Sequence, residues 1–165
     1  MDDAEARREL LAVLTEDARQ ETADVARQLG IAEQRAAALI ETLEAEGALQ
    51  GYQAVVDWDR TGVPHVTAEL ELNVELDRET TYQDVARRVV QFSEVESLHL
   101  VSGDFDFAAT VEGESMNDVS HFVAERIATI PEVTQTVTHF VMETYKHRGV
   151  EFEGDDEDDR LSVSP

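Results

Sequence analysis

The chain has 165 residues and a mass of 18.4 kDa, which suffices for two small domains and excludes a large multidomain enzyme. Asp and Glu number 37 against 13 Lys and Arg, a formal net charge of −24, yet 42% of the residues are hydrophobic, too many for disorder driven by charge. Because cysteine is absent, disulfides, cysteine-based zinc sites and thiol nucleophiles are excluded.

The acidic residues are spread along the whole chain, and Lys146 is the only lysine. This composition is typical of proteins that work in molar salt, where a Debye length of about 3 Å suppresses the repulsion between carboxylates. No apolar run approaches the roughly 20 residues of a membrane helix, and the acidic N-terminus lacks the charge pattern of a signal peptide. We expect a cytoplasmic protein.

Residues 4–47 carry apolar side chains at helical spacing, which predicts three helices. The first ends near Asp17. The second opens at Thr22, a good N-cap residue, and stops at Gly30, where a left-handed C-cap is easy. The third runs from about Ala32 to Glu46. A short helix, a glycine turn and a longer helix predict a helix-turn-helix unit, with an ordinary three-helix bundle as the alternative.

The segment after these helices differs in composition. Residues 48–57, with Gly51 in the middle, read as a short extended pair that would form a wing. The polar stretch from Asp59 to Pro64 predicts a linker.

After Pro64 the pattern predicts strands alternating with helices. The expected elements are a strand at 66–76, a helix at 82–92 after the cap candidates Thr80 and Thr81, strands at 95–101 and 105–111, a helix after Ser115 and Asp118, and a last strand at 132–145. This order, βαββαβ, predicts an α+β fold with a ferredoxin-like antiparallel sheet and both helices on one face. The first and last strands also suggest an apolar opposite face, which a second copy would cover.

The predicted organisation has four parts. These are a helix-turn-helix domain at 1–50, wing and linker at 51–65, an effector and dimerisation domain at 66–146, and an acidic tail at 147–165. From Arg148 the tail holds seven acids and two arginines, with an acidic run at 155–159, and this predicts solvated coil. Whether Leu161–Val163 adds a short extended segment stays open.

Several local strings support a family resemblance. They are LLAVLTEDAR, VARQLGI and ETLEAEGALQGYQAVVD in the first domain, and VSGDFDF and EVTQTVTHFV in the second. Together with the order of elements, they make the chain resemble the Lrp/AsnC, or feast/famine, regulators from about Leu10 to Tyr145. The GDFD turn is the most specific piece, and the acidic composition resembles a haloarchaeal member.

The resemblance implies a transcriptional regulator that binds double-stranded DNA sequence-specifically as a homodimer, often assembled into octamers. It also implies a small effector, typically an amino acid, bound at the GDFD-type turn. The reading helix departs from the family pattern in two ways. It begins at Ala32 instead of Ser, and its outward face carries one basic residue, Arg35, and one acidic residue, Glu41. Residues 1–50 hold five arginines and twelve acids.

The DNA-binding candidates lie at the starts of the second and third helices. They are Arg19, Gln20, Thr22, Gln34, Arg35, Ala38 and Thr42. Gln34 and Arg35 have the chemistry to read adenine and guanine edges, and a helix N-terminus favours a phosphate. The plainer interpretations are that Arg35 is an exposed helix residue and that Arg19 pairs with a nearby carboxylate. Because counterion release is nearly exhausted in molar salt, the net charge is weak evidence against DNA.

The effector candidates lie at one turn and along the last strand. They are Ser102, Gly103, Asp104, Phe105, Asp106, Thr134, Thr136 and Thr138. Two carboxylates suit an ammonium group and free turn N–H groups suit a carboxylate, which together describe an amino acid. The three threonines alternate and so should share a face. The plainer interpretation is ordinary turn and strand chemistry.

Other chemistry has little support in the sequence. The histidines show no close ligand spacing, although His99 and His139 could approach on neighbouring strands, so we expect neither a metal site nor a cofactor. No GxSxG, Walker or GxGxxG string occurs, and an enzyme would have to use Asp104 or His99 as a base. The alternative to a DNA-binding regulator is a sensor or heteromeric modulator of the same fold that has lost specific DNA binding.

Overall fold

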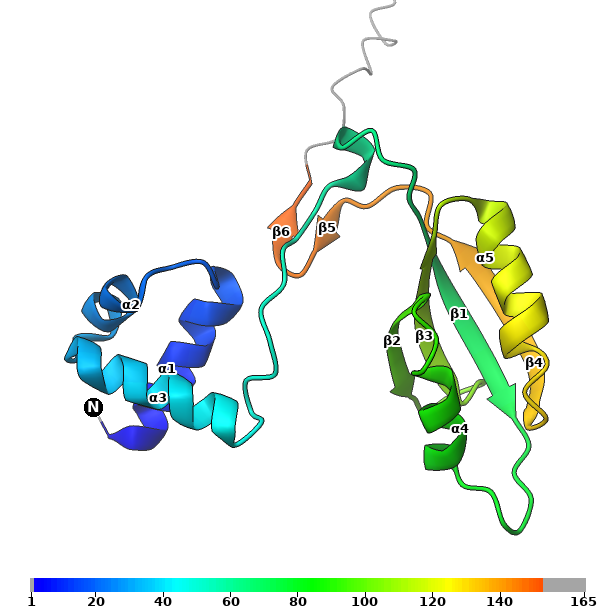
Figure 1. Cartoon of the computed structure of the whole chain (residues 1–165), viewed down its shortest axis with the longest axis horizontal. Helices are drawn as coiled ribbons and strands as arrows, with labels where there is room; N and C mark the ends of the chain where they lie inside the picture. The colour runs from blue at the N-terminus through cyan, green and yellow to red at the C-terminus, as the bar shows by residue number, and fades with distance from the viewer. Residues whose placement is uncertain (1, 153–165) are drawn as a thin grey trace, which may run out of the picture. The chain divides into compact units, whose positions relative to one another are not determined.

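The computed structural model describes residues 2–152, which form two compact units (Figure 1). The first unit holds the residues up to Val56 together with Lys146–Glu151, and the second holds Asp57–Tyr145. A short C-terminal segment therefore belongs with the N-terminal helices, although the whole stretch Asp57–Tyr145 separates the two along the chain.

Three helices make up most of the first unit: α1 (Asp3–Glu16), α2 (Thr22–Leu29) and α3 (Glu33–Ala45). Apolar side chains three or four residues apart face one another in a single core. Its buried members are Ala6, Leu10, Leu14, Val25, Leu29, Leu39 and Leu43. The helix-turn-helix prediction is confirmed.

The helix ends follow local chemistry with one exception. The Asp2 carboxylate caps α1 by accepting the backbone N–H of Glu5 at 2.8 Å, and Gly30 ends α2 at φ +66°. The prediction that Thr22 caps α2 is wrong. Thr22 is the first helical residue, and Glu21 stands at the cap position without a side-chain hydrogen bond to the helix.

The expected extended pair at 48–57 is also wrong. Within this segment no residues pair as strands, and only a 3₁₀ turn, η1 (Trp58–Arg60), follows it. The segment instead contacts residues outside itself: the Tyr52 hydroxyl donates to the Glu44 carboxylate at 3.0 Å, and the Arg148 guanidinium donates to the Gln53 side chain. Ten residues centred on a glycine are too few to bury a face of their own.

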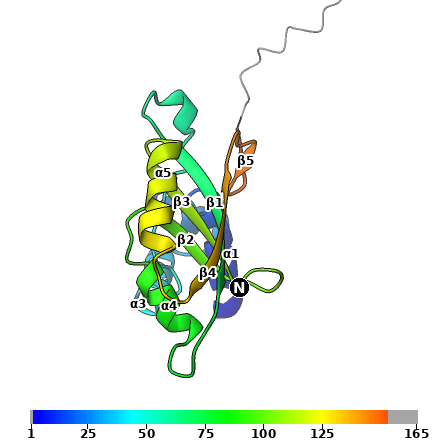
Figure 2. The same ribbon diagram turned by 90° about the vertical axis from the view of Figure 1, so that its right-hand side faces the viewer.

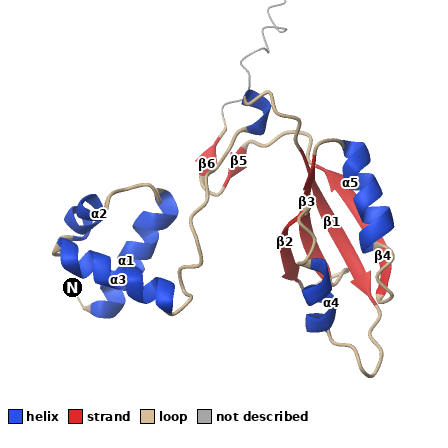
Figure 3. Ribbon diagram, in the orientation of Figure 1, coloured by secondary structure: helices blue, strands red, loops and turns tan. Residues whose placement is uncertain are grey.

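The second unit contains β1 (Val66–Val74), α4 (Tyr82–Val89), β2 (Val95–Leu100), β3 (Phe107–Gly113), α5 (Met116–Phe122) and β4 (Val133–Phe140) (Figure 3). The sheet order is β2-β3-β1-β4 with every pair antiparallel. Both helices lie on one face of the sheet (Figure 2). The predicted ferredoxin-like α+β fold is confirmed, although the outer strands and α4 end sooner than the apolar pattern suggests.

The core of this unit lies between the sheet and its two helices. Alternate residues of β1, namely Ala68, Leu70 and Leu72, are buried there with Phe107 and Val111 of β3. Thr81 and Asp84 form a capping box at α4, and the Ser115 hydroxyl accepts the Asp118 N–H at 3.1 Å to cap α5. Helix α5 continues as a π-helical turn, η2 (Val123–Ile127).

The open face of the sheet is polar, so the expectation of an apolar face is wrong. The strand register places on it Thr67, Glu69, Glu71, Ser97, His99, Thr110 and His139, with Ala108, Val137 and Val141 among its apolar members. The reason is that strict alternation in β1 sends every large apolar side chain to the helix side. Hydrogen bonds link the polar residues: the Thr110 hydroxyl lies 3.2 Å from the Glu69 carboxylate.

The segment expected to be coil from residue 147 begins with a hairpin. Strands β5 (Lys146–His147) and β6 (Val150–Glu151) pair antiparallel around a two-residue turn. The acidic run at 155–159 and the segment Leu161–Val163 lie outside the described residues. Within residues 2–152, no helix has the length and apolar character to cross a membrane.

Candidate functional site

Helix α3 presents one face to solvent because its other face is held in the core. Ala36, Leu39 and Leu43 are buried, and Gln34, Ala38, Glu41 and Thr42 on the opposite side are exposed. Helix α2 and the left-handed turn at Gly30 precede it, as in a helix-turn-helix reader. The Thr42 hydroxyl donates to the Ala38 carbonyl at 2.7 Å, so its own helix already uses that donor.

Arg35 is engaged by another helix. One of its guanidinium nitrogens lies 2.7 Å from the carboxylate of Asp3 in α1, and the Arg35 side chain is 40% exposed. The arginine best suited to read a base therefore shares its charge with a carboxylate 32 residues earlier in the chain. Sequence reasoning missed Asp3, because only the packing of α1 against α3 brings the two together.

The residues before α2 lie in an exposed turn. The backbone N–H of Arg19 donates to the Asp17 carboxylate at 2.9 Å, and Gln20 accepts a hydrogen bond from Gln28. Within the described residues, no carboxylate forms an ion pair with the Arg19 guanidinium, so the plainer interpretation of this arginine is not found there. Arg19 is thus an exposed cation beside a helix start that has no side-chain cap.

Other arginines of this unit are paired with acids. Arg7 makes two hydrogen bonds of 2.8 Å to the Glu46 carboxylate, and Arg27 forms an ion pair with Asp24 one turn earlier. Hydrogen bonding to Arg7 lowers the pKa of Glu46, which keeps that carboxylate charged. The first unit therefore offers few uncompensated positive charges to a polyanion.

The turn between β2 and β3 holds two carboxylates with different surroundings. The Asp106 carboxylate accepts the Val74 N–H at 2.8 Å and the Tyr82 hydroxyl at 3.2 Å. This negative charge raises the pKa of Tyr82. Ser102, Gly103 and Asp104 are exposed, whereas Phe105 and Asp106 are half-buried. Asp106 ties the turn to β1 and α4, and Asp104 is the carboxylate open to solvent.

Asn73 connects this turn to the last strand. Its side-chain amide donates to the Asp104 carbonyl at 2.9 Å, and its carbonyl accepts the Thr134 hydroxyl at 3.2 Å. Sequence reasoning missed Asn73, whose only signal was a polar residue near the end of a strand. The structure brings Thr134 close to the turn through this residue.

Thr136 and Thr138 lie elsewhere on β4. They stand opposite Leu72 and Leu70 of β1, and a bulge at Asn73/Val74 leaves Thr134 without a direct partner on β1. Thr136 and Thr138 thus share one face of the sheet as expected, whereas the bulge takes Thr134 out of this alternation.

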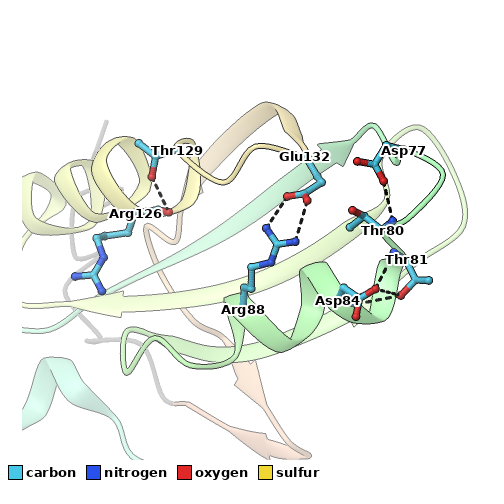
Figure 4. Close-up of polar contacts among 8 residues, drawn as sticks. All are labelled: Asp77, Thr80, Thr81, Asp84, Arg88, Arg126, Thr129 and Glu132. Atoms are coloured by element: carbon cyan, nitrogen blue, oxygen red, sulfur yellow. Dashed lines mark hydrogen bonds and ion pairs between the residues drawn. The ribbon is translucent and has the colours of Figure 1, made fainter.

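Ion pairs and capping bonds connect residues around α4 (Figure 4). Arg88 of α4 makes two hydrogen bonds of 2.8 Å to Glu132, which immediately precedes β4. Asp77, after β1, accepts the backbone N–H groups of Glu79 and Thr80, and these bonds lower its pKa. Arg88 thus ties the end of α4 to the start of β4, and Asp77 fixes the loop between β1 and α4.

The histidines of the described residues lie at separate places in the second unit and the hairpin. His99 and His139 lie on β2 and β4, the two opposite edges of the sheet, so the expectation that they approach on neighbouring strands is wrong. His139 lies 3.1 Å from the Glu71 carboxylate, and His65 stacks on Trp58 with ring centroids 4.3 Å apart. Among residues 2–152, no three His, Asp or Glu side chains are placed to hold a metal ion.

Comparison with known protein families matches both units. Residues 4–50 match a winged helix-turn-helix DNA-binding domain, and residues 67–151 match the Lrp/AsnC ligand binding domain.

Individual relatives match most of the chain. The uncharacterized HTH-type transcriptional regulator YugG of Bacillus subtilis is 37% identical over 95% of each chain. The leucine-responsive regulatory protein of Escherichia coli is 28% identical over 84% of each chain. The structure of AsnC from E. coli has a TM-score of 0.68 at 21% identity, covering 91% of this chain and 98% of that chain. For a Neisseria meningitidis transcriptional regulator in complex with L-Met the TM-score is 0.69 at 21% identity, with 89% and 93% coverage.

Proposed function

Because the chain belongs to the Lrp/AsnC family of transcriptional regulators, we propose that it is a dimeric regulator, adapted to molar salt, that binds specific duplex DNA and responds to an amino acid. The observation that carries this proposal is the pairing of a helix-turn-helix unit with a sheet domain whose β2–β3 turn presents a carboxylate and free backbone groups. Each part of the proposal has its own test.

The DNA part rests on the exposed face of α3 and on the turn before α2. Gln34 and Arg35 are the base-reading candidates, and Arg19 is the phosphate candidate. The direct test is selection of binding sites from random duplexes at molar KCl. Enrichment of a defined sequence supports the reader. If no sequence is enriched, the chain acts as a sensor or heteromeric modulator instead.

The effector part rests on the turn at 102–106 and its tie to Asn73 and Thr134. An ammonium group suits the exposed Asp104 carboxylate, and the backbone N–H groups of the turn suit the carboxylate of the same ligand. The Neisseria relative is described as a complex with L-Met, and the E. coli relative as leucine-responsive, which favours an amino acid here too. Calorimetric titration of the twenty amino acids in molar KCl tests this part.

The assembly part rests on the open sheet face. Two such faces would meet through hydrogen bonds and ion pairs, with the small apolar residues Ala108 and Val137 on either side of Glu71. If the effector binds beside this interface, it can shift oligomer size or DNA affinity only as far as it binds one assembly state more tightly than the other. DNA must then change the affinity for the effector by the same factor. Sedimentation with and without the bound amino acid measures that coupling.

A further inference from the structure

The hairpin β5–β6 is the most basic surface feature near the helix-turn-helix unit. Lys146, His147 and Arg148 are consecutive in a chain of 37 acids that has no other lysine. All three are exposed, and Arg148 and Gly149 form the tip. The hairpin groups with the residues up to Val56 and not with the sheet domain from which the chain arrives.

The backbone at this tip is strained at an arginine. Arg148 has φ +47° and Gly149 φ +85°, and Arg148 is the one non-glycine residue with positive φ among residues 2–152. A two-residue hairpin turn of this kind favours Asn or Asp followed by Gly, because Arg disfavours the left-handed region. An arginine in this unfavourable backbone conformation indicates a function for its side chain.

The Arg148 guanidinium is bound to a neutral group, in contrast to many arginines of this chain. It donates to the side-chain oxygen of Gln53, in the segment that leaves α3, whereas Arg7, Arg27 and Arg35 pair with carboxylates. Its positive charge is therefore not compensated by this contact, and the guanidinium has further N–H donors. Lys146 lies 3.4 Å from Glu151 across the hairpin, an exposed pair that is weak in salt.

We propose that this C-terminal hairpin acts as the wing of the DNA reader and contacts the phosphate backbone through Lys146 and Arg148. The inference rests on the proposed function and adds a binding surface to it. The segment at 48–57, where a wing was expected, contains no strand pair, and the hairpin lies against that segment through Gln53. Duplex DNA suits the hairpin because phosphates accept hydrogen bonds from guanidinium and ammonium groups.

The absence of cysteine permits a direct test with the full chain. His147→Cys keeps both proposed phosphate contacts and provides the only thiol, which can carry a photo-activated crosslinker. With selected duplex DNA in KCl, we expect His147→Cys to crosslink to the DNA, as does Gln34→Cys on the reading helix. Arg78→Cys, at the far end of β1 from the linker, measures the background.

The three variants separate the two claims. The hairpin proposal is overturned if Gln34→Cys crosslinks to DNA while His147→Cys stays at the background of Arg78→Cys. That result leaves the proposed reading helix intact. Crosslinking of His147→Cys to a second protein chain in place of DNA also overturns it. If the unmodified protein binds no DNA at all, the proposed function itself fails, and this inference fails with it.

A charge series gives a second, independent readout. Arg148→Asn tolerates the left-handed backbone and removes the charge, and Arg148→Lys keeps the charge. We expect Arg148→Asn to lower affinity roughly three- to tenfold for selected and random duplexes alike, and to reduce the slope of log affinity against log salt by about 0.9. Arg148→Lys should restore most of both. Equal slopes in all three proteins contradict a phosphate contact.

Discussion

For Arg35, the sequence predicts a base contact and the structure shows an ion pair with another helix. On the exposed face of α3 it has the donors to read guanine, yet its guanidinium lies 2.7 Å from the Asp3 carboxylate. DNA must therefore compete with an internal acid for this side chain. In a protein with far more acids than bases, such internal competition offers a way to weaken nonspecific binding without losing the arginine.

We expect Arg35→Ala to weaken binding to a selected site roughly ten- to a hundredfold, since a bidentate base contact contributes about 1 to 3 kcal/mol. Preference should relax at one base pair. Asp3→Asn should act in the opposite direction, because it removes the negative charge that faces the guanidinium while keeping the size of the side chain. Fluorescence anisotropy with the selected duplex in KCl measures both. Unchanged binding in Arg35→Ala means that the reading helix is misassigned.

The two carboxylates of the β2–β3 turn should behave differently when replaced. Asp104→Ala should abolish amino-acid binding and leave the melting temperature unchanged, because Asp104 is exposed. Asp106→Ala should lower stability by about 1 to 2 kcal/mol as well, since the half-buried Val74 N–H loses its acceptor. Calorimetric titration and thermal melting of the two variants separate these effects. If neither substitution changes ligand binding, the turn is only a well-made hairpin.

Among the elements, α4 and β4 depend most on one ion pair. Arg88 and Glu132 join the end of α4 to the residue before β4 through two hydrogen bonds of 2.8 Å, and the Glu132 side chain is only 12% exposed. The Arg88 hydrogen bond lowers the pKa of Glu132 below its ordinary value. The elements that carry Tyr82 and Thr134 are thereby kept in register with the turn.

We expect Glu132→Gln to lower the melting temperature at pH 7 in constant KCl. A lowered folded-state pKa means that the stabilisation is complete above the ordinary value of about 4.3 and is lost as the pH falls through the folded-state value. The difference from the unmodified protein should therefore narrow below pH 4. Arg87→Gln, which removes an exposed pair to Asp84 at 3.7 Å, serves as the control and should change little. A difference that stays constant with pH contradicts the assignment.

For the molecule as a whole, the excess of negative charge is the dominant feature. The 37 acids leave many carboxylates without a basic partner, and dilution of salt lengthens the range of their repulsion. We expect circular dichroism and sedimentation to show loss of structure or of association when the protein is dialysed from molar KCl to about 0.1 M. Full retention of both would show that the acidic composition serves something other than adaptation to salt.

The proposed dimer can be tested at the centre of the open sheet face. Ala108 lies there between Glu71 of β1 and His99 of β2, and Ala108→Arg would place a long charged side chain in the contact. We expect this variant to sediment as a monomer in molar KCl. Ala124→Arg, at an exposed position of η2 on the helix side, should remain a dimer. Dimers of Ala108→Arg would assign the interface to another surface.

The local periodicities of the sequence determined the helices, the order of helices and strands along the chain, and the caps at Ser115 and Thr81. Spacings of 3.6 and 2 residues, and cap side chains three residues from their partners, are set by neighbours along the chain. The family resemblance likewise depends on short sequence motifs, so the GDFD turn can be identified without knowledge of the residues that contact it.

Which side chains contact one another depends on the folded chain. Arg35 and Asp3, Asn73 and Asp104, and Arg148 and Gln53 are separated by 32, 31 and 95 residues, and no period in the sequence relates them. The sequence of β1 alone indicates a polar open face. The apolar residues of β4 suggest the opposite, and only the register with β1 assigns each of them to one side of the sheet. Contacts between distant residues depend on the path of the folded backbone, and that path follows from packing of the two cores.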